Sequence, residues 1–385
     1  MGQGLDRPLP SDGPSRRVCL VGLIAGGHSG IPRYAARLTK ALDEVAEEYP
    51  HLSLSLLTTA AGAEAVGARS IAVDVVAGKS RRVNAGPGRL LLEHVLVRRR
   101  KADLYHYFDV TGPVLAPRRR FVATVHYTAF VHGYAPRSSA YKRRLYPWAL
   151  ARAAALVAVS QFAKDEAVRY FGANPAKIEV VHSGPGLFSA DGSAAAAPER
   201  EESPFLLYVG NLGGNKNLPF LVRSFARADP PARLVLAGRA RGGVEELRAA
   251  IDAAPNRDRI ELRSEVPDAE LERLYRSAAA LLLPSVYEGF GFTALEAMGR
   301  GCPVLASDIP ALREVSGSGA LLLPLGDEAA WAEAMRRVVA DEELRADLRN
   351  RGAETVARYS WEATARGVLD LLARSAGAVA APPAA

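Results

Sequence analysis

Short apolar segments alternate with amphipathic segments along the first half of this chain. Short runs of β-branched residues and leucine are typical of parallel strands that are buried on both faces. They predict strands at Val18–Ile24, Leu52–Thr58, Ile71–Val76, Leu104–Tyr107, Phe121–Val125, Leu156–Ser160 and Ile178–His182. Apolar positions that recur with the helical period predict helices at Pro32–Tyr49, Arg89–Arg99 and Gln161–Phe171.

The same alternation starts again in the second half. Between the two halves lies Gly184–Ser203, which is rich in Gly, Pro, Ser and Ala, as an exposed linker would be. Strands are then predicted at Phe205–Val209, Arg233–Leu236, Ile260–Leu262, Ala279–Leu283, Val304–Ser307 and Ala320–Leu323. Helices are predicted at Leu218–Arg227, Val244–Ala253, Ala294–Met298, Glu328–Ala340 and Trp361–Ser375.

Alternating strands and helices indicate an α/β protein with parallel sheets and right-handed crossovers. Two such blocks predict two Rossmann-like, doubly wound domains that face an interdomain cleft, with ligands at the carboxyl ends of the strands. The predicted division is a disordered N-terminus at 1–15, a first domain at 16–188, a linker at 189–203, a second domain at 204–358, a helix at 359–375 that crosses back to the first domain, and a disordered tail at 376–385.

Composition excludes several classes of protein. The 385 residues are 49% hydrophobic and 24% charged, which is ordinary for a globular protein. No apolar run approaches the ~20 residues that a membrane span needs, and Met1–Ser15 lacks the apolar middle of a signal peptide. With only Cys19 and Cys302, no disulfide framework is available, and a cytoplasmic location is expected.

Charge is distributed unevenly. The first 200 residues hold 27 Lys or Arg and 16 Asp or Glu, a balance of +11, whereas the rest hold 22 and 26, a balance of −4. The excess lies in clusters at Arg81–Arg82, Arg98–Lys101, Arg118–Arg120 and Lys142–Arg144. Such clusters either form a solvated basic face or contact an anionic substrate or membrane surface. Nucleic-acid binding is disfavoured because no nucleic-acid module accompanies the charge.

The loop Ala25–Gly30 follows the first predicted strand and precedes a helix. It nearly fits the dinucleotide-binding fingerprint, with Ala in place of the first Gly. That fingerprint also needs an acid at the end of the second strand, where this chain has Thr58 and Thr59. A nicotinamide cofactor is therefore a weak hypothesis, a tight turn explains the glycines, and a phosphate or sugar contact at Gly30 stays open.

A second glycine-rich loop, Pro284–Gly291, follows a predicted strand and leads into a helix that opens near Phe292. The backbone amides at such an opening favour anions, and Glu288 and Glu296 flank it. Carboxylates repel phosphate but accept hydrogen bonds from paired hydroxyls, so the set suits a diphosphate with a sugar at each end. The alternative is that Glu296 is an acid favoured by the helix dipole and Glu288 an ordinary loop acid.

This stretch resembles the Glu-x7-Glu signature of the retaining glycosyltransferases of family 4, which have the two-domain GT-B fold. Further segments are similar to that family: Gly301–Ser307 to the segment after the signature, Tyr208–Leu218 to its opening strand and diphosphate loop, Gly30–Tyr34 to its N-terminal loop, and Val125-His126 to its interdomain histidine. The first domain would then bind the acceptor, and the second would bind a nucleotide-sugar.

The resemblance implies roles for individual residues. Lys216 would neutralise the leaving diphosphate, Glu288 and His126 would contact the transferred sugar, and these three form the predicted catalytic set. Glu296 would accept the ribose hydroxyls. Asn211 and Asn215 stand where the family often has basic residues, so Arg239 is a candidate replacement for the missing charge. The remaining predicted donor-binding residues are Gly30, Val266 at the base, Gly289, Phe290, Gly291, Phe292 and Thr293.

The implied activity is transfer of a hexose-type sugar, of the mannose, glucose or rhamnose class, from a nucleotide-diphosphate sugar to a hydroxyl of a saccharide or lipid-linked acceptor, in polysaccharide or glycoconjugate biosynthesis. No cofactor and no metal are expected, since the chain has no Asp-x-Asp motif. A peripheral location at the inner membrane face is a further expectation. The alternatives are a nucleotide-sugar 2-epimerase, a dehydrogenase and a non-catalytic nucleotide-sugar-binding module; the sugar, the base and the oligomeric state stay open.

Overall fold

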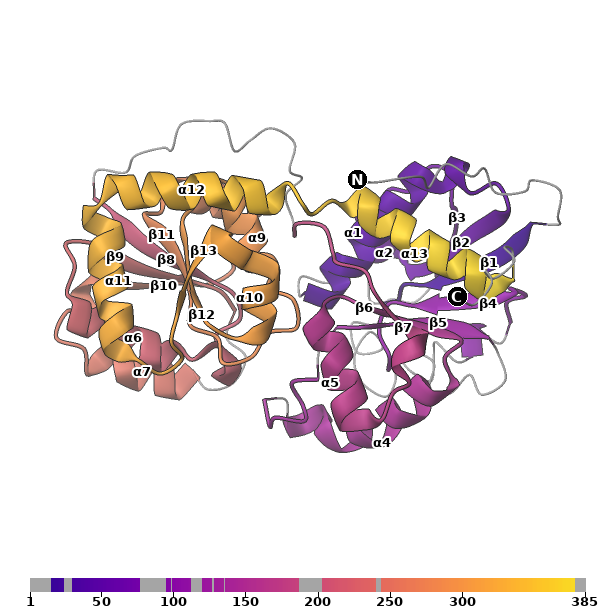
Figure 1. Cartoon of the computed structure of the whole chain (residues 1–385), viewed down its shortest axis with the longest axis horizontal. Coiled ribbons are helices and arrows are strands. Elements are labelled where there is room, and N and C mark those ends of the chain that lie inside the picture. Colours follow the sequence, from indigo (N-terminus) through magenta and orange to yellow (C-terminus); the bar gives the residue numbers. More distant parts are fainter. Residues whose placement is uncertain are drawn as a thin grey trace. The chain divides into compact units, whose positions relative to one another are not determined.

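The computed structural model describes residues 15–23, 30–76, 95–97, 99–111, 120–126, 128–134, 136–186, 203–239 and 244–377. The chain divides into two compact units (Figure 1). Unit 1 comprises Met1–Gly184 and Trp361–Ala385, and unit 2 comprises Pro185–Ser360. Across the part of the chain that is described, every helix is too short or too polar to cross a bilayer.

Unit 1 is built on a parallel sheet in which seven strands are described, in the order β3-β2-β1-β4-β5-β6-β7. Most of the central strands are fully buried, as their continuous apolar runs predict. The strands are β1 (Arg16–Val21), β2 (Leu52–Thr59), β3 (Ala72–Val76), β4 (Leu104–Tyr107), β5 (Phe121–Val125), β6 (Ala155–Ala158) and β7 (Ile178–Val180). The helices described are α1 (Gly30–Val45), α2 (Ala60–Val66), α4 (Pro136–Arg152), α5 (Gln161–Phe171) and α13 (Trp361–Ala376).

Helix α13 belongs to unit 1 although it ends the chain, and it packs along α1 (Figure 1). Its apolar face is buried and its polar face is tied to the unit by hydrogen bonds. The Tyr49 hydroxyl donates to Asp370 at 2.8 Å, and the Thr364 hydroxyl donates to the backbone carbonyl of His182, also at 2.8 Å. The chain therefore passes from one unit to the other twice, after Gly184 and before Trp361.

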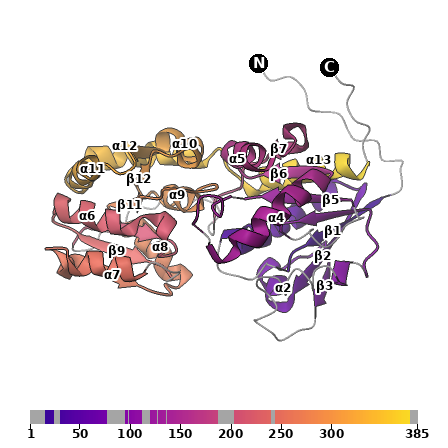
Figure 2. The same cartoon turned by 90° about the horizontal axis from the view of Figure 1, so that it is seen from below.

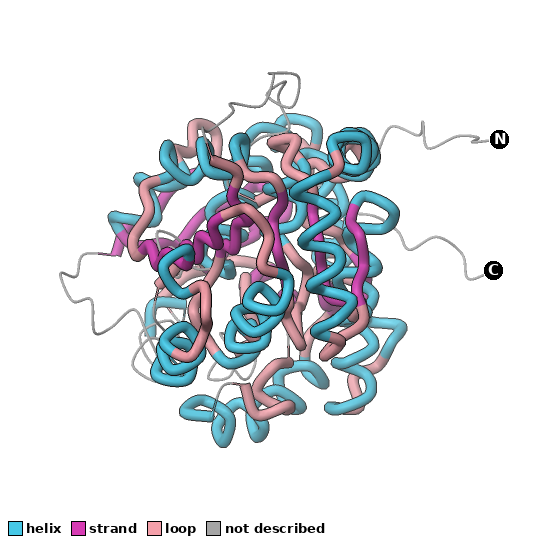
Figure 3. Tube along the Cα trace, turned by 90° about the vertical axis from the view of Figure 1, so that its left-hand side faces the viewer, coloured by secondary structure: helices cyan, strands magenta, loops and turns pink. Residues whose placement is uncertain are grey.

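Unit 2 contains a second parallel sheet, with six described strands in the order β10-β9-β8-β11-β12-β13. Figure 2 shows helices above and below these strands, and the alternation can be followed along the tube in Figure 3. The strands are β8 (Phe205–Val209), β9 (Arg233–Ala237), β10 (Ile260–Arg263), β11 (Ala280–Leu283), β12 (Val304–Ser307) and β13 (Ala320–Leu323). The helices are α6 (Leu218–Ala228), α7 (Val244–Asp252), α8 (Asp268–Ser277), α9 (Phe292–Met298), α10 (Pro310–Ser316), α11 (Glu328–Ala340) and α12 (Glu342–Val356).

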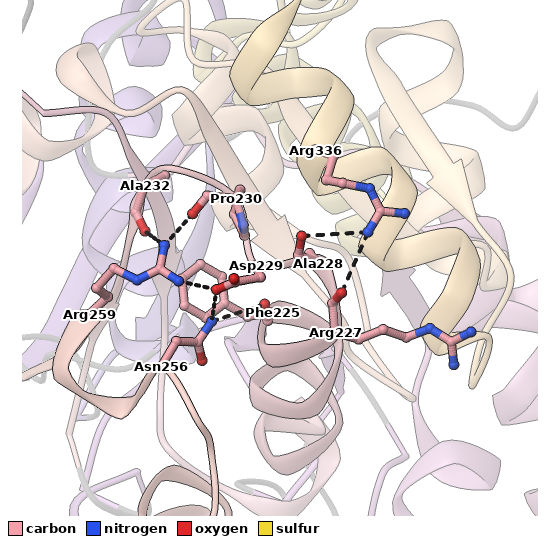
Figure 4. A network of polar contacts seen from close by, with 9 residues as sticks. All are labelled: Phe225, Arg227, Ala228, Asp229, Pro230, Ala232, Asn256, Arg259 and Arg336. Carbon is pink, nitrogen blue, oxygen red and sulfur yellow. Dashed lines mark hydrogen bonds and ion pairs between the residues drawn. The ribbon is translucent and has the colours of Figure 1, made fainter.

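The end of helix α6 is held by side chains from two other segments, the turn at 256–259 and helix α11 (Figure 4). Asp229 ends the helix in the left-handed conformation with φ 43°, and its carboxylate accepts from Asn256 at 3.0 Å and pairs with Arg259. Arg336 of α11 donates to carbonyl groups of the last turn. These donors satisfy carbonyls that a helix end leaves without intrahelical partners, so the last turn of α6 is firmly anchored.

The structure corrects the predicted elements in several places. The first strand ends at Val21 rather than Ile24. Helices α2, α4, α8, α10 and α12 were absent from the prediction. Helix α4 contains Pro147, and the apolar residues of α4 and α12 do not gather on one face, so the helical period is weak in both. The predicted helix Arg89–Arg99 is described only at 95–97, where it is helical, and at Arg99, which lies in a turn. Residues 1–14, most of the linker at 189–203 and the tail from 378 lie outside the described residues.

Candidate functional site

The site in unit 2 begins with two neighbouring parallel strands. Strands β8 and β11 are paired side by side, and the order of the sheet reverses between them, since β9 and β10 continue on one side and β12 and β13 on the other. Ligands of open α/β sheets bind at such a switch point, outside the carboxyl ends of the strands. The two loops that leave β8 and β11 at this edge carry most of the predicted site residues.

The two loops are joined by an ion pair. The Lys216 ammonium contacts the Glu288 carboxylate, and the two side chains are 18% and 17% exposed. The Ser285 hydroxyl donates to the same carboxylate oxygen at 2.7 Å. This cation and this carboxylate, 72 residues apart in sequence, are therefore placed together at the edge of the sheet.

Asn215 ties the same loops together through the backbone. Its side-chain amide donates to the carbonyl of Tyr287 at 3.2 Å, and its own carbonyl accepts from the amide of Val286 at 3.0 Å. The residue that replaces a basic side chain of the family pattern thus acts as a bridge between loops. Hydrogen bonds between Asn215 and the neighbouring loop therefore fix the backbone that carries Lys216 and Glu288.

The start of the β8 loop depends on the close approach of two glycines. A Cβ at Gly238, after β9, would lie 1.6 Å from the carbonyl oxygen of Gly210. The buried Tyr208 hydroxyl donates to the carbonyl of Asn211 at 2.8 Å. Burial raises the pKa of this phenol, and the Glu288 charge acts in the same direction. Tyr208 therefore stays neutral, and its hydroxyl proton remains available for the hydrogen bond to the Asn211 carbonyl.

The β11 loop turns into helix α9 through Gly291. Its φ of 102° lies in the left-handed region that favours glycine, and a Cβ there would also come within 2.8 Å of Leu312. The buried Phe290 ring packs against Phe292 at 5.0 Å between ring centres. The backbone of Gly289, Phe292 and Thr293 completes this turn, and Gly291, the residue before the helix, has no side chain with which to cap it.

Glu296 lies within helix α9 rather than in the loop. Its side chain is buried, and the Tyr275 hydroxyl of α8 donates to its Oε2 atom at 3.0 Å. Glu288 and Glu296 therefore have different partners, one cationic and one phenolic. The eight-residue spacing places the first acid on the loop and the second on the helix, as expected.

Two further predicted residues follow strands on the other side of β8. Val266 is half-buried after β10, next to Glu265, whose φ of 57° makes a sharp turn. Arg239 follows β9 and lies 3.8 Å from the exposed Glu265 carboxylate. Arg239 is thus on the same edge of the sheet, but its described ion-pair partner is an acid of the neighbouring loop.

The predicted residues His126 and Gly30 belong to unit 1. His126 follows β5 and is buried, and its Nε2 atom lies 2.7 Å from the carbonyl oxygen of Phe108. A carbonyl only accepts, so Nε2 carries the proton. Burial lowers the pKa of His126, against the opposing effects of Asp109 and the Phe108 carbonyl. Gly30 is the exposed first residue of α1, and residues 24–29 of its loop lie outside the described residues.

Two family models match the chain, one in each half. The model described as "Glycosyltransferase Family 4" matches residues 28–185, and the model described as "Glycosyl transferases group 1" matches residues 192–355. The chain belongs to the family 4 glycosyltransferases.

Two curated relatives are named after sugar-transfer activities. A D-inositol 3-phosphate glycosyltransferase of Segniliparus rotundus is 32% identical over 228 residues, which are 56% of this chain and 51% of the relative. The O-antigen chain mannosyltransferase RfbU of Salmonella typhimurium is 29% identical over 236 residues, 61% of this chain and 64% of that protein. The chain thus spans about half to two thirds of the length of these relatives.

A solved structure supports the fold of the glycosyltransferase. The Anabaena protein HepE in complex with UDP-glucose has a TM-score of 0.71 and 17% identity, over 93% of this chain and 100% of that one. The two parallel-sheet Rossmann-like units therefore have the GT-B fold, as the sequence predicts. Among the described residues, no group of three His, Cys, Asp or Glu side chains is placed to hold a metal ion.

Sequence reasoning missed two contacts of the candidate site. Ser285, which donates to Glu288, lies inside the motif itself. Tyr275, which donates to Glu296, lies on the unpredicted helix α8, whose buried Leu271, Leu274 and Tyr275 follow the helical spacing and were the available signal.

Proposed function

We propose that this enzyme transfers a hexose-type sugar, of the mannose, glucose or rhamnose class, from a nucleotide-diphosphate sugar to a hydroxyl of a saccharide or lipid-linked acceptor, with retention of anomeric configuration. The Lys216–Glu288 contact at the switch point between β8 and β11 carries the proposal. It combines a cation suited to a diphosphate with a carboxylate suited to sugar hydroxyls. The names of the mannosyltransferase RfbU and of the UDP-glucose complex of HepE support this class of donor.

The proposed donor lies along the edge of the sheet. Lys216 and the backbone at the start of α9 would face the diphosphate, because helix openings favour anions. Glu288 would accept hydrogen bonds from the transferred sugar, and Glu296 from the ribose. The half-buried Val266 would contact the base. When the donor binds, Lys216 would turn from Glu288 to the phosphates.

The chemical difficulty is the charge that develops on the leaving diphosphate as the bond to the anomeric carbon breaks. Lys216, already positioned by the loop frame, would stabilise this charge without reorganising at the moment of reaction. The acceptor hydroxyl would attack the same face of the sugar and give its proton to the departing phosphate oxygen. We propose that this step needs no divalent metal, with Lys216 supplying the positive charge.

His126 would contact the sugar from unit 1. Its Nε2 proton is directed to Phe108 and its lowered pKa favours the neutral ring, so Nδ1 is the atom that accepts a hydrogen bond from a hydroxyl. The positive balance of the first 200 residues suits an acceptor that carries phosphate, and also a peripheral contact with an anionic membrane. Removing the charges of Arg98–Lys101 should then weaken sedimentation with anionic vesicles, and unchanged sedimentation would leave this cluster as a solvated face.

The function is tested in two steps on the full chain. A panel of nucleotide-sugars in a thermal-shift screen identifies the donor, because a bound ligand raises Tm by mass action. Release of nucleoside diphosphate is then measured with a panel of saccharide acceptors, and the anomeric configuration of the product is read by NMR. Turnover of donor without acceptor to an epimeric nucleotide-sugar indicates a 2-epimerase, an inverted product contradicts retention, and binding without turnover indicates a binding module.

A further inference from the structure

The Glu296 side chain is more deeply buried than its place in the motif requires. It is only 3% exposed, although it stands in a helix at the ligand edge of the sheet. A glutamate has three rotatable side-chain bonds, and ordering such a side chain costs conformational entropy. The surroundings of this carboxylate therefore decide whether it is in position before a ligand arrives.

One oxygen of Glu296 is held by α8. The Tyr275 hydroxyl donates to Oε2 at 3.0 Å, and the Tyr275 ring is completely buried, so its position is set by packing. A hydrogen bond to an ionised acceptor is about twice as strong as a neutral one. A carboxylate has about four acceptor positions, so this bond is compatible with hydrogen bonds from two ribose hydroxyls.

The other oxygen lies against the backbone of Gly186, just after the chain enters unit 2. A Cβ at Gly186 would lie 1.9 Å from Oε1 of Glu296, and 2.6 and 2.7 Å from the next two carbon atoms of that side chain. All three distances are below any real Cβ contact, so the glutamate occupies the space that a side chain at 186 would fill. Only glycine at this position leaves the carboxylate where it is.

A buried arginine adds charge to this environment. Arg300 follows α9, and its Nε atom lies 3.5 Å from the Glu272 carboxylate of α8. Burial lowers the pKa of Arg300, while the charges of Glu272 and Glu296 act in the opposite direction. The carboxylate of Glu296 thus lies within electrostatic reach of a fixed positive charge, which adds to the restraint from Tyr275 and Gly186.

We propose that Tyr275 and Gly186 are positioning residues that fix the Glu296 carboxylate for recognition of the donor ribose, which rests on the proposed function. Tyr275 orients Oε2 by its hydrogen bond, and Gly186 leaves room for Oε1. Neither residue touches the donor. Each determines how well the enzyme distinguishes a ribose from a sugar without the 2′ and 3′ hydroxyls, because preorganised acceptors gain affinity by reducing the ordering cost of binding.

The test measures that discrimination by calorimetry on the full chain. UDP, GDP and ADP and their 2′,3′-dideoxy counterparts are titrated, and the ratio of the dideoxy to the ribo dissociation constant is compared between variants. We expect a ratio of about 10 to 100 for the wild type, since one hydrogen bond to a charged group is worth about tenfold or more. Tyr275→Phe should reduce the ratio about tenfold through weaker ribonucleotide binding, with dideoxynucleotide binding unchanged. Gly186→Ala should bring the ratio close to 1.

Matched controls separate positioning from general damage. Tyr49→Phe in unit 1 also removes a tyrosine hydroxyl that donates to a carboxylate, at 2.8 Å from Asp370. Gly319→Ala places a Cβ 2.6 Å from the buried Thr355 hydroxyl oxygen. Both variants should keep the wild-type ratio even where Tm falls.

The outcomes distinguish this inference from the proposed function. Equal weakening of ribo- and dideoxynucleotides by Tyr275→Phe, or an unchanged ratio, overturns the positioning role while nucleotide binding stands. A wild-type ratio near 1 shows that Glu296 does not recognise the ribose and overturns the inference. Absence of binding by the wild type to these three ribonucleotides and to every nucleotide-sugar of the thermal-shift panel contradicts the proposed function itself.

Discussion

Replacing Lys216 by alanine is the most direct test of the proposed chemistry. In the structure the Lys216 ammonium is paired with Glu288 on the neighbouring loop, and both side chains are largely shielded from solvent. The pair forms at the switch point of the sheet, where the diphosphate of the donor is proposed to lie. The substitution therefore removes the cation that we assign to the leaving group and leaves the rest of the loop frame intact.

The size of the effect follows from what Lys216 is proposed to do. Charge on the leaving diphosphate is greatest in the transition state, and loss of one positioned donor to such a charge costs about 10²–10³ in kcat, or ~2.7–4 kcal/mol. Because the interaction strengthens in the transition state, kcat and kcat/KM should fall together. Stability should change less, by about 1–3 kcal/mol, since Glu288 keeps its hydrogen bond from Ser285 at 2.7 Å.

The assay is the initial rate of nucleoside diphosphate release at saturating donor and acceptor. Lys164→Ala is the matched control, because Lys164 also holds a partner, the backbone carbonyl of Ile178 at 2.9 Å, but lies in unit 1 on α5. The control should lose some stability and keep its kcat. Lys216→Arg, which retains the charge, should recover part of the lost rate.

A kcat within threefold of the wild type for folded Lys216→Ala would refute the reasoning. It would show that the charge of the leaving group is stabilised elsewhere. An effect confined to KM would also contradict the transition-state role, because it would mean that Lys216 contributes equally to donor binding and to the transition state.

Three further predictions follow from other parts of the structure. Gly238→Ala should lower the free energy of unfolding by about 1–3 kcal/mol, since its Cβ would meet the Gly210 carbonyl, whereas Gly214→Ala, with open space around it, should change it little in chemical denaturation. Burial lowers the pKa of His106 to about 3. Between pH ~3 and pH ~6.5 the imidazole is therefore protonated in the unfolded state but not in the folded state, so the free energy of unfolding falls as the pH is lowered through this range. In His106→Gln, the slope of unfolding free energy against pH should be smaller by up to ~1.4 kcal/mol per pH unit. Incubation with EDTA should leave the rate of diphosphate release unchanged, and a loss restored by Mg²⁺ would contradict the proposed metal independence.

Local sequence patterns predict the two-unit fold well because each buried parallel strand is a short apolar run. Strands such as Phe121–Val125 and Phe205–Val209 have the predicted bounds for this reason. The prediction of helices fails where the helical period of apolar residues is weak. Helix α12 shows little separation of apolar and polar faces, and α4 contains Pro147, so neither has the period by which amphipathic helices are recognised.

The motif residues were predictable, but their partners were not, because partners depend on which strands lie side by side. Lys216 and Glu288 meet because β8, which has β9 on one side, pairs on its other side with β11, a strand that comes much later in the chain. No spacing in the sequence specifies that order. The prediction therefore assigned Glu288 to sugar hydroxyls and Lys216 to phosphate, and did not include the ion pair that joins the two side chains in the structure.

The turn between Glu288 and Glu296 determines how the two acids are placed. On one regular helix, residues eight apart would differ by ~80° in direction. Here Gly291, in the left-handed conformation, ends the loop before α9 begins, so Glu288 and Glu296 belong to different elements and have partners from different directions. A non-glycine residue at 291 would be strained and would also meet Leu312. The glycine between the acids is thus what allows one loop and one short helix to direct two carboxylates to two separate sets of partners.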